Sequence, residues 1–154
     1  MVNIVPFQPQ HRDAFERLNL AWITRHWEPE LKDFQVLGDP QKHIIAHGGY
    51  IAMALEDDNA VGCCALIRQD AACFELAKMA VEELVRGQGI GWALAHHVID
   101  RARSQGAERV FLESNTVLTP AINLYRKLGF KVVTGPPSPY ERANVQMELT
   151  LASQ

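Results

Sequence analysis

Apolar residues crowd three consecutive runs in the middle of the chain, and short polar segments separate these runs. Runs of this length and composition predict β-strands, and connections as short as Asp57-Asp58-Asn59 and Gln69-Asp70 predict an antiparallel meander. The three predicted strands are residues 50–56, 61–68 and 73–81.

Helical periodicity marks four other segments. In residues 90–105 every fourth position from Ile90 to Ala102 is apolar, so this helix is expected to pack one face on the sheet and to end at Gly106. Asp39 is expected to cap a further short helical turn. The other predicted helices are residues 10–26, 29–37 and 119–128.

Shorter apolar runs predict the remaining strands. Residues 110–112 follow the helix at 90–105, so they are expected to pair in parallel with the strand at 73–81 through one crossover. The others are residues 3–7, 131–134 and 145–151, with a proline-rich loop at 135–139. Together these elements predict one α/β (α+β) domain over residues 1–154, with a mixed, mostly antiparallel central sheet flanked by helices.

Composition narrows the class of function. The 154 residues are 47% apolar and 21% charged, as in an ordinary globular domain. A net charge of −3 gives no basic field for nucleic acid or an anionic membrane, so neither is an expected partner. The chain shows no signal-peptide pattern and no membrane-spanning apolar run, so the cytoplasm is its expected location.

No metal site is expected from the sequence. Cys63, Cys64 and Cys73 fit no disulfide framework or zinc spacing and are expected to be small buried residues. His43 and His47 stand four residues apart, so a helix would place both on one face. No carboxylate or cysteine completes a ligand pattern with them.

The segment Arg86-Gly87-Gln88-Gly89-Ile90-Gly91 lies between the strand at 73–81 and the helix that follows. Glycine lets backbone N–H groups approach a ligand closely, and the first turn of the helix adds free donors and a positive dipole end. A pyrophosphate fits such a junction, and Arg86 adds a charge that pairs well with phosphate. On local composition, a tight turn without a ligand has about equal weight.

Two better-known phosphate loops differ from this segment. A P-loop requires Gly-Lys-Ser/Thr after four residues that follow a first glycine, and the chain contains no such run. A dinucleotide-binding loop requires a third glycine where Trp92 stands, although Glu113 follows at about the distance of a ribose-binding acidic residue. Spacing alone leaves that second loop open.

Two motifs, in this order, resemble the GNAT N-acetyltransferase family. The first is Met79-Ala80-Val81 followed by Arg86-x-x-Gly89-x-Gly91, and the second is Ala121-Ile122-Asn123-Leu124-Tyr125-Arg126-Lys127-Leu128-Gly129-Phe130. The resemblance implies an acyl-CoA N-acyltransferase fold whose central strands, ending at Val81 and Ser114, splay apart. It implies acetyl-CoA as the co-substrate, with its pantetheine arm lying along the first of these strands.

The resemblance also assigns residues to acetyl-CoA. An N–H near Met79 would polarise the thioester carbonyl, and the segment from Arg86 to Gly91 would hold the pyrophosphate. Asn115 is expected to take the contact of a family asparagine whose position Leu118 occupies. The implied cofactor-binding residues are Met79, Ala80, Val81, Arg86, Gly87, Gln88, Gly89, Ile90, Gly91, Asn115, Ala121 and Tyr125.

Tyr125 and Glu75 are the predicted catalytic pair. The resemblance makes Tyr125 the general acid that protonates the leaving sulfur, and the alternative is that its ring only packs beside Leu128. Glu75 interrupts an apolar strand, where burial raises the pKa of a carboxyl group, which suits a general base or substrate anchor. The equally weighted alternative is an ion pair with Lys78, which requires a β-bulge because a regular strand puts the two side chains on opposite faces.

The acceptor site is implied to lie between the N-terminal helices and the loop before the last strand, beside Trp22, His26, Trp27, Tyr140 and Arg142. An arginine suits carboxylate recognition, but simple solvation of this loop residue is the preferred interpretation. The predicted substrate-binding residues are Trp27, Glu75, Tyr140 and Arg142.

Three functions fit these observations. The main prediction is an acetyl-CoA-dependent N-acetyltransferase that acts on a primary amine of a small molecule, with a homodimer among the expected assemblies. A protein or peptide N-acetyltransferase would need an open peptide groove. A non-catalytic acyl-CoA sensor would need neither Tyr125 nor Glu75.

Overall fold

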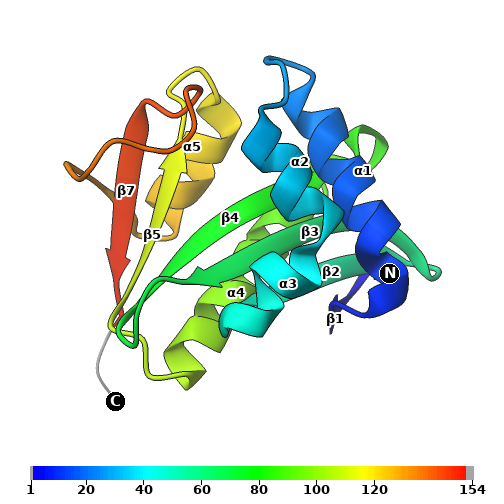
Figure 1. The fold of residues 1–154 in the computed structure, drawn as a ribbon, viewed down its shortest axis with the longest axis horizontal. Helices are drawn as coiled ribbons and strands as arrows, with labels where there is room; N and C mark the ends of the chain where they lie inside the picture. Colours follow the sequence, from blue (N-terminus) through cyan, green and yellow to red (C-terminus); the bar gives the residue numbers. More distant parts are fainter. Residues whose placement is uncertain (1, 152–154) are drawn as a thin grey trace.

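The computed structural model describes residues 2–151, and within them the strands form one seven-stranded sheet in the order β1-β2-β3-β4-β5-β7-β6 (Figure 1). All neighbouring pairs are antiparallel except β4 and β5. The predicted mixed, mostly antiparallel sheet is therefore confirmed. The strands are β1 (Val2–Pro6), β2 (Tyr50–Glu56), β3 (Asn59–Arg68), β4 (Cys73–Val81), β5 (Arg109–Ser114), β6 (Lys131–Val133) and β7 (Val145–Thr150).

Helices cover both faces of the sheet, and the sheet separates two apolar cores. Helices α1, α2 and α3 lie on one face, and α4 lies across the other (Figure 1). The core under α4 also contains Ile122 and Tyr125 of α5, whereas Phe15 and Leu37 belong to the core under α1 to α3. The helices are α1 (Arg12–Ile23), α2 (Leu31–Gly38), α3 (Pro40–His43), α4 (Ile90–Ser104) and α5 (Thr119–Lys127), with 3-10 turns η1 (Pro9–His11), η2 (Ile45–His47) and η3 (Glu83–Val85).

The predicted elements are present, with shifts at their ends that have local causes. Asp57 and Asp58 both have positive φ, so they form a two-residue hairpin turn and β3 starts at Asn59 instead of residue 61. The helix predicted to reach residue 26 ends at Ile23, because Arg25 and His26 donate to i−3 carbonyls instead of continuing the i−4 pattern. Asp39 caps α3 as predicted, accepting a hydrogen bond of 3.2 Å from a backbone N–H.

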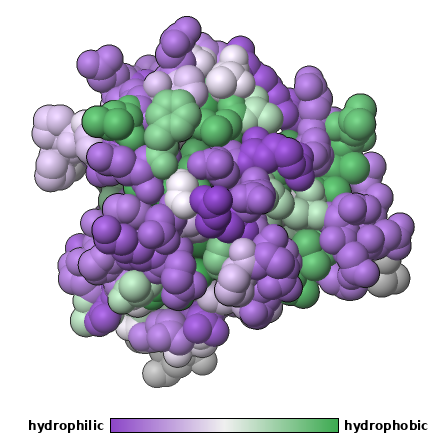
Figure 2. All heavy atoms as spheres, turned by 45° about the vertical axis from the view of Figure 1, so that its right-hand side comes forward, coloured by the Kyte–Doolittle hydropathy of each residue, from purple (hydrophilic) through white to green (hydrophobic). Residues whose placement is uncertain are grey.

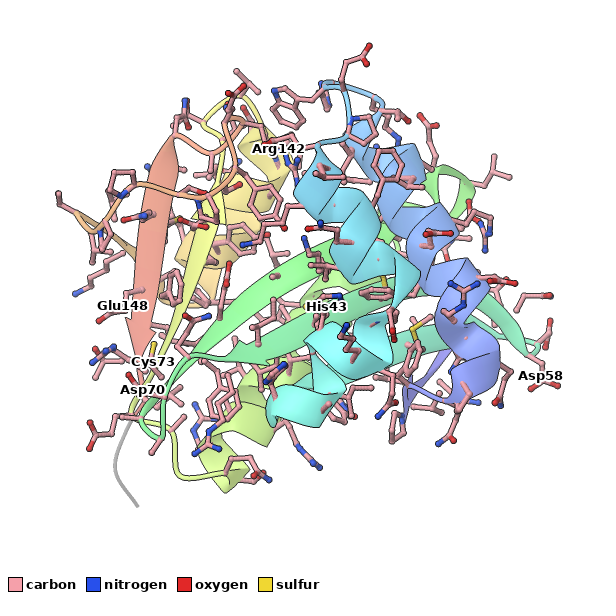
Figure 3. The ribbon with its side chains drawn as sticks, in the orientation of Figure 1. His43, Asp58, Asp70, Cys73, Arg142 and Glu148 are labelled. Atoms are coloured by element: carbon pink, nitrogen blue, oxygen red, sulfur yellow. The ribbon has the colours of Figure 1, made fainter. Side chains whose placement is uncertain are left out.

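The parallel strands β4 and β5 pair over three residues only. Cys73 lies opposite Arg109 and Glu75 lies opposite Phe111, and beyond this point the two strands diverge (Figure 1). Figure 3 labels Cys73 at the paired end and Arg142 at the open end. The splay implied by the resemblance is therefore present, and it leaves one edge of β4 facing an opening instead of a neighbouring strand.

A β-bulge at Lys78 interrupts β4 where the opening begins. Two steps along β3 match three steps along β4, and Lys78 adopts a left-handed φ of 55°. The extra residue reverses the alternation of the strand. Phe74 and Leu76 face the core under α4 before the bulge, whereas Met79 and Val81 face the same core after it. A bulge was the condition under which Glu75 and Lys78 share a side of the sheet, and that condition is met.

Charged and polar side chains cover most of the face in Figure 2, and apolar side chains lie in separate areas. The exposed large apolar residues include Leu31 and Phe34 on α2 and Leu84 in η3. Among residues 2–151, no helix is both long and apolar enough to cross a membrane.

Candidate active site

The opening between β4 and β5 contains a cavity that collects residues from distant parts of the sequence. Its walls come from β4 between Glu75 and Met79, from β5 at Glu113 and from α5 at Tyr125. Trp27 and Leu118 close its sides. Both predicted catalytic residues therefore line one space, although fifty residues separate them in the sequence.

Glu75 lines this cavity, and its pKa is raised to about 7. Burial is the main cause, and the negative charge of Glu113 adds to it, while Lys78 and Lys32 act in the opposite direction. Gln69 donates a hydrogen bond of 3.3 Å to its Oε1 atom. A carboxyl group with a pKa near 7 is well matched to a general base at neutral pH.

The structural alternative for Glu75 was an ion pair with Lys78. Within the described part of the chain, Lys78 has other partners: its Nζ donates to Tyr140 Oη at 2.8 Å and lies 3.9 Å from Asp33 Oδ1. Burial lowers the pKa of Lys78 to about 8 against the opposing effect of Asp33. Lys78 still influences the pKa of Glu75 through its charge, but it forms no ion pair with the Glu75 carboxylate.

Tyr125 projects from α5 into the region where two cavities meet. Its ring packs edge to face with Phe130 at a centroid distance of 5.9 Å, and only 8% of the residue is exposed. Burial raises the pKa of its hydroxyl well above the ordinary value, so the phenol keeps its proton across the neutral range. The packing interpretation and the acid interpretation thus describe the same side chain, because the buried ring holds a protonated hydroxyl at the cavity wall.

A second cavity extends from Tyr125 along β4 to the glycine segment. Gly87 and Gly89 have φ values of 81° and 79°, which favour glycine, and no neighbouring atom lies within 4 Å of where a Cβ would stand. The first turn of α4 starts immediately afterwards, so its free N–H groups lie beside Arg86. This open cradle has the chemistry of a site for a phosphate-bearing ligand.

Most of the predicted cofactor residues meet in this second cavity, and Trp22 and His26 also line it. Gln88 is exposed and lies outside both linings. Asn115 lines the first cavity, but its amide already donates to the Arg142 carbonyl at 2.7 Å and accepts from the Val117 N–H at 2.9 Å. The predicted residues in the second lining are Met79, Ala80, Val81, Arg86, Gly87, Gly89, Ile90, Gly91, Ala121 and Tyr125.

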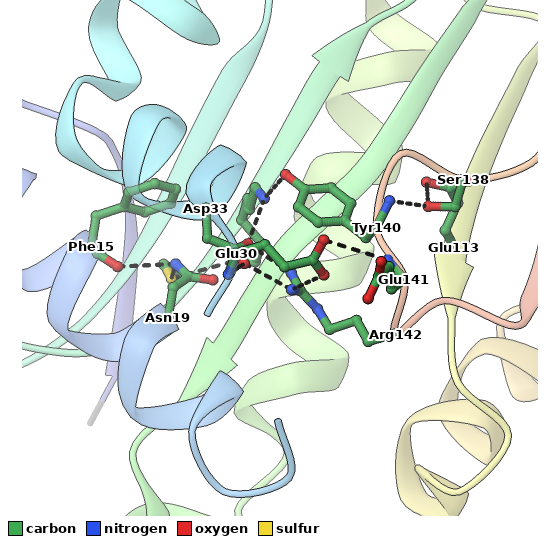
Figure 4. A network of polar contacts seen from close by, with 11 residues as sticks. Phe15, Asn19, Glu30, Asp33, Glu113, Ser138, Tyr140, Glu141 and Arg142 are labelled. Carbon is green, nitrogen blue, oxygen red and sulfur yellow. Dashed lines mark hydrogen bonds and ion pairs between the residues drawn. The ribbon is translucent and has the colours of Figure 1, made fainter. Parts of the chain in front are cut away.

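The loop before β7 forms a strap, residues 138–143, across the open end of the sheet (Figure 4). Arg142 donates to both oxygens of Asp33 at 2.7 and 2.8 Å and approaches Glu30 at 3.3 Å. Its side chain is 14% exposed, and Asp33 is fully buried. The preferred interpretation of Arg142 as a solvated loop residue is therefore wrong, because a carboxylate on α2 holds it.

Sequence reasoning missed or assigned elsewhere Lys78 and Glu113, which line the first cavity, and Asp33, which contacts its lining residues Arg142 and Lys78. Burial alone would raise the pKa of Asp33, but hydrogen bonds from Arg142 and the Glu30 N–H outweigh this effect and lower it. Glu113 had been considered only as a ribose ligand. An acidic residue inside the otherwise apolar face of α2 was the one signal in the sequence for Asp33.

Histidines and cysteines form no metal site in residues 2–151, where no three ligand-type side chains cluster. His43 belongs to α3 and His47 to η2, so they do not share one helix. Cys63, Cys64 and Cys73 are free and buried, as predicted.

Comparisons with known proteins agree with this geometry. The family model described as "Acetyltransferase (GNAT) family" matches residues 12–130. An uncharacterised N-acetyltransferase of Mycobacterium tuberculosis is 32% identical over 80% of this chain and 70% of its own length. The crystal structure of a GNAT-family acetyltransferase from Staphylococcus aureus superposes with a TM-score of 0.90 at 21% identity, covering 99% of this chain and 100% of that one.

A further neighbour was solved with coenzyme A. This aminoglycoside 6'-N-acetyltransferase superposes with a TM-score of 0.75 at 16% identity, covering 99% of this chain and 98% of that one. At this identity the likeness concerns the fold alone.

Proposed function

This chain belongs to the GNAT acetyltransferase family, and we propose that it moves an acetyl group from acetyl-CoA directly to a primary amine of a small molecule. The observation that carries the proposal is the opening between β4 and β5. There a cavity lined by Glu75 meets, at Tyr125, a second cavity lined by the glycine cradle.

The residues of the second cavity fit acetyl-CoA. Backbone N–H groups of the first turn of α4, together with Arg86, suit the diphosphate, and Gly87 and Gly89 leave space for it. The edge of β4 beyond Glu75 has no β5 partner, so its main-chain groups near Met79 are available to the pantetheine arm. When bound, acetyl-CoA supplies an activated acetyl group on a sulfur leaving group.

Glu75 and Tyr125 account for the proton transfers. Glu75 takes one proton from the acceptor's ammonium group and so frees the nitrogen lone pair for attack. As the new C–N bond forms and the C–S bond breaks, Tyr125 gives its proton to the departing sulfur. A second proton from the nitrogen restores the Tyr125 phenol, and Glu75 releases its own proton to solvent.

The strap supports a small acceptor over a peptide. The hydrogen bonds from Arg142 to Asp33 tie the loop before β7 to α2, on the side of Glu75 away from the glycine cradle. A peptide chain would need an extended groove across this side, whereas a compact amine needs only the space beneath the strap. The presence of both Glu75 and Tyr125 in one cavity favours catalysis over an acyl-CoA sensor.

A release assay for free thiol tests the proposal. Purified protein is incubated with acetyl-CoA and a panel of small primary amines, free lysine, and peptides with free N-termini, and coenzyme A is quantified. We expect turnover on small amines that exceeds turnover on peptides, with an increase of 42 Da in the acceptor as the independent readout. Preferential peptide acetylation would support the protein-directed alternative, and thermal stabilisation by acetyl-CoA without any turnover would support the sensor.

A further inference from the structure

We propose that Glu113 is a second acceptor-binding carboxylate, and that Glu75 and Glu113 together form a cradle for the acceptor's ammonium group. This inference rests on the proposed function, because it concerns the acceptor half of the same site. It adds a specificity-determining residue and a substrate class: amines that arrive as cations.

The register of the sheet places the two carboxylates on the same side. Glu75 lies opposite Phe111 in the last paired position of β4 and β5. Glu113 is two residues beyond Phe111 on β5, so it faces the same side of the sheet as Glu75. Both side chains line the cavity between the strands, and both also line the adjoining cavity on the strap side.

The carboxylate of Glu113 is held by neutral donors. Ser138 Oγ donates to its Oε1 at 3.0 Å, and Gln146 Nε2 donates to its Oε2 at 3.1 Å. Figure 4 shows the Ser138 contact, which reaches Glu113 from the strap. These bonds orient the group without neutralising it, since neither donor carries a charge.

Neither carboxylate of the pair has an ion-pair partner within 4 Å in the described part of the chain. Lys78 is directed to Tyr140 and Asp33, and Lys32 acts on Glu75 only through its charge. Two negative groups that share a partly buried space without a counter-ion are costly. An ammonium group between them removes that cost, and it is also the protonated form of the proposed acceptor.

The two carboxylates then have different tasks. Glu75 is the base, and the charge of Glu113 raises the affinity of Glu75 for the proton that it must take. Glu113 keeps the nitrogen in place while that proton leaves. Glu113 is therefore a positioning residue, and it selects cationic over neutral molecules of the same shape.

A binding experiment that needs no turnover tests this inference. Propylammonium is titrated at pH 8 into the protein with carbon-13 in its glutamate carboxyl groups, and the Glu75 signal is followed by NMR. We expect saturable binding of propylammonium, no binding of the neutral 1-propanol at the same concentrations, and about tenfold weaker binding of propylammonium to Glu113→Gln.

Glu148→Gln is the matched control. Glu148 is a carboxylate on β7 at the paired end of the strands, 3.8 Å from Arg109 (Figure 3). Its removal should leave propylammonium binding unchanged, and melting curves verify that both variants fold. If Glu113→Gln and the wild type bind propylammonium with equal affinity, the inference is overturned.

The thiol-release assay separates this result from the fate of the proposed function. In an active enzyme, Glu113→Gln should raise the KM for the amine at least fivefold while the KM for acetyl-CoA stays the same. If no amine is turned over, the propylammonium titration still decides the role of Glu113. If the wild type is active and Glu113→Gln has the same KM for the amine, the result would contradict the proposed role of Glu113 but not the proposed function.

Discussion

The raised pKa of Glu75, a cavity-lining carboxyl group, sets its proposed catalytic role against the stability of the fold. The folded protein binds the proton of Glu75 more tightly than the unfolded chain does, since its pKa rises from an ordinary 4.5 to about 7. A raised pKa means that ionisation destabilises the folded state. Glu75 therefore stabilises the fold least at the pH where its proposed role as a base requires it to be ionised.

Replacement of Glu75 by Gln separates these two effects. Below pH 4.5 the group is protonated in both states, so the substitution should change stability little. Above pH 7 the folded wild type holds an ionised carboxylate that the unfolded chain solvates better, so Glu75→Gln should be more stable by on the order of 2 kcal/mol. Urea unfolding at pH 4 and pH 8 measures the difference, and an equal effect at both values would contradict the raised pKa.

The activity of the same enzyme should rise as the pH increases through about 7, because Glu75 must be ionised to accept a proton. Glu75→Gln should lose this limb and about a hundredfold in turnover. The measurement is the pH profile of kcat with saturating amine. A wild-type profile that is flat between pH 6 and pH 8 would exclude Glu75 as the base.

Tyr125→Phe tests the acid. The phenyl ring preserves the packing on Phe130, so acetyl-CoA binding and melting temperature should stay close to those of the wild type. Turnover should fall by about a hundredfold, because the departing sulfur loses its proton donor. Calorimetry for binding and thiol release for kcat supply both readouts, and an unchanged kcat would show that the ring serves packing only.

Residues differ in how far the sequence reveals them. Glu75 stands out because a carboxylate interrupts an apolar strand, and Tyr125 because it lies within a recognisable motif. Lys78 and Glu113 do not stand out, since the bulge and the strand register decide which side they face. The role of Arg142 was misjudged because its partner Asp33 is over a hundred residues away in the sequence.

At the level of elements, α4 has at each end a glycine in a conformation that other residues rarely adopt. Gly89 precedes α4 and Gly106 follows it, and both have a φ near 80° with empty space around the missing Cβ. The two positions share the same backbone requirement. They differ in that Gly89 lines the proposed acetyl-CoA cavity, whereas Gly106 lies beyond the opposite end of α4.

This symmetry supplies a matched pair of substitutions. Gly89→Ala and Gly106→Ala should each cost about 1 kcal/mol of stability, because alanine disfavours positive φ. Only Gly89→Ala should also weaken acetyl-CoA binding, by at least tenfold, since it distorts the phosphate cradle. Urea unfolding and calorimetry give the two numbers, and equal acetyl-CoA affinity in both variants would mean that the junction is only a turn.

Element order and type were predictable because periodicity and turn residues act locally. The meander of β2, β3 and β4 and the crossover through α4 follow from the spacing of polar turns along the chain. The ends of the elements were less predictable. Strand β3 begins two residues earlier than predicted, because Asp57 and Asp58 form the preceding turn with positive φ. Residues 31–37 of α2 were predicted to be helical, but the binding of Asp33 to the strap was not predicted.

Across the whole molecule, the strap connects the two parts that the splay separates. The end of the sheet with β5, β7 and α5 lies on one side of the opening, and α1 and α2 lie on the other (Figure 1). Arg142 and Asp33 join them through two short hydrogen bonds at a buried position. The strap is therefore held across the opening by contacts between distant segments, of which the Arg142–Asp33 ion pair is the most buried.

Arg142→Met should show how much this connection contributes. It leaves the buried Asp33 with only the more distant Lys78 as a cationic partner, so the loss of stability should be about 3 kcal/mol at pH 7. Arg17→Met is the matched control: its ion pair with Glu82 is exposed, and its removal should cost less than about 1 kcal/mol. Urea unfolding of both variants against the wild type measures the contrast.

The pH dependence and the mobility of the strap distinguish this ion pair from mere loss of packing. The pKa of Asp33 is below its ordinary 3.8 in the folded wild type, so its contribution is present above that pH and disappears as the pH falls further. The stability gap between wild type and Arg142→Met should therefore narrow below pH 4, and hydrogen exchange of residues 138–143 should accelerate at pH 7.

Because a released strap uncovers the acceptor side, peptide acetylation should rise relative to small-amine acetylation in this variant. If exchange accelerates while that ratio stays constant, the strap is a structural tie and the preference for small acceptors has another origin.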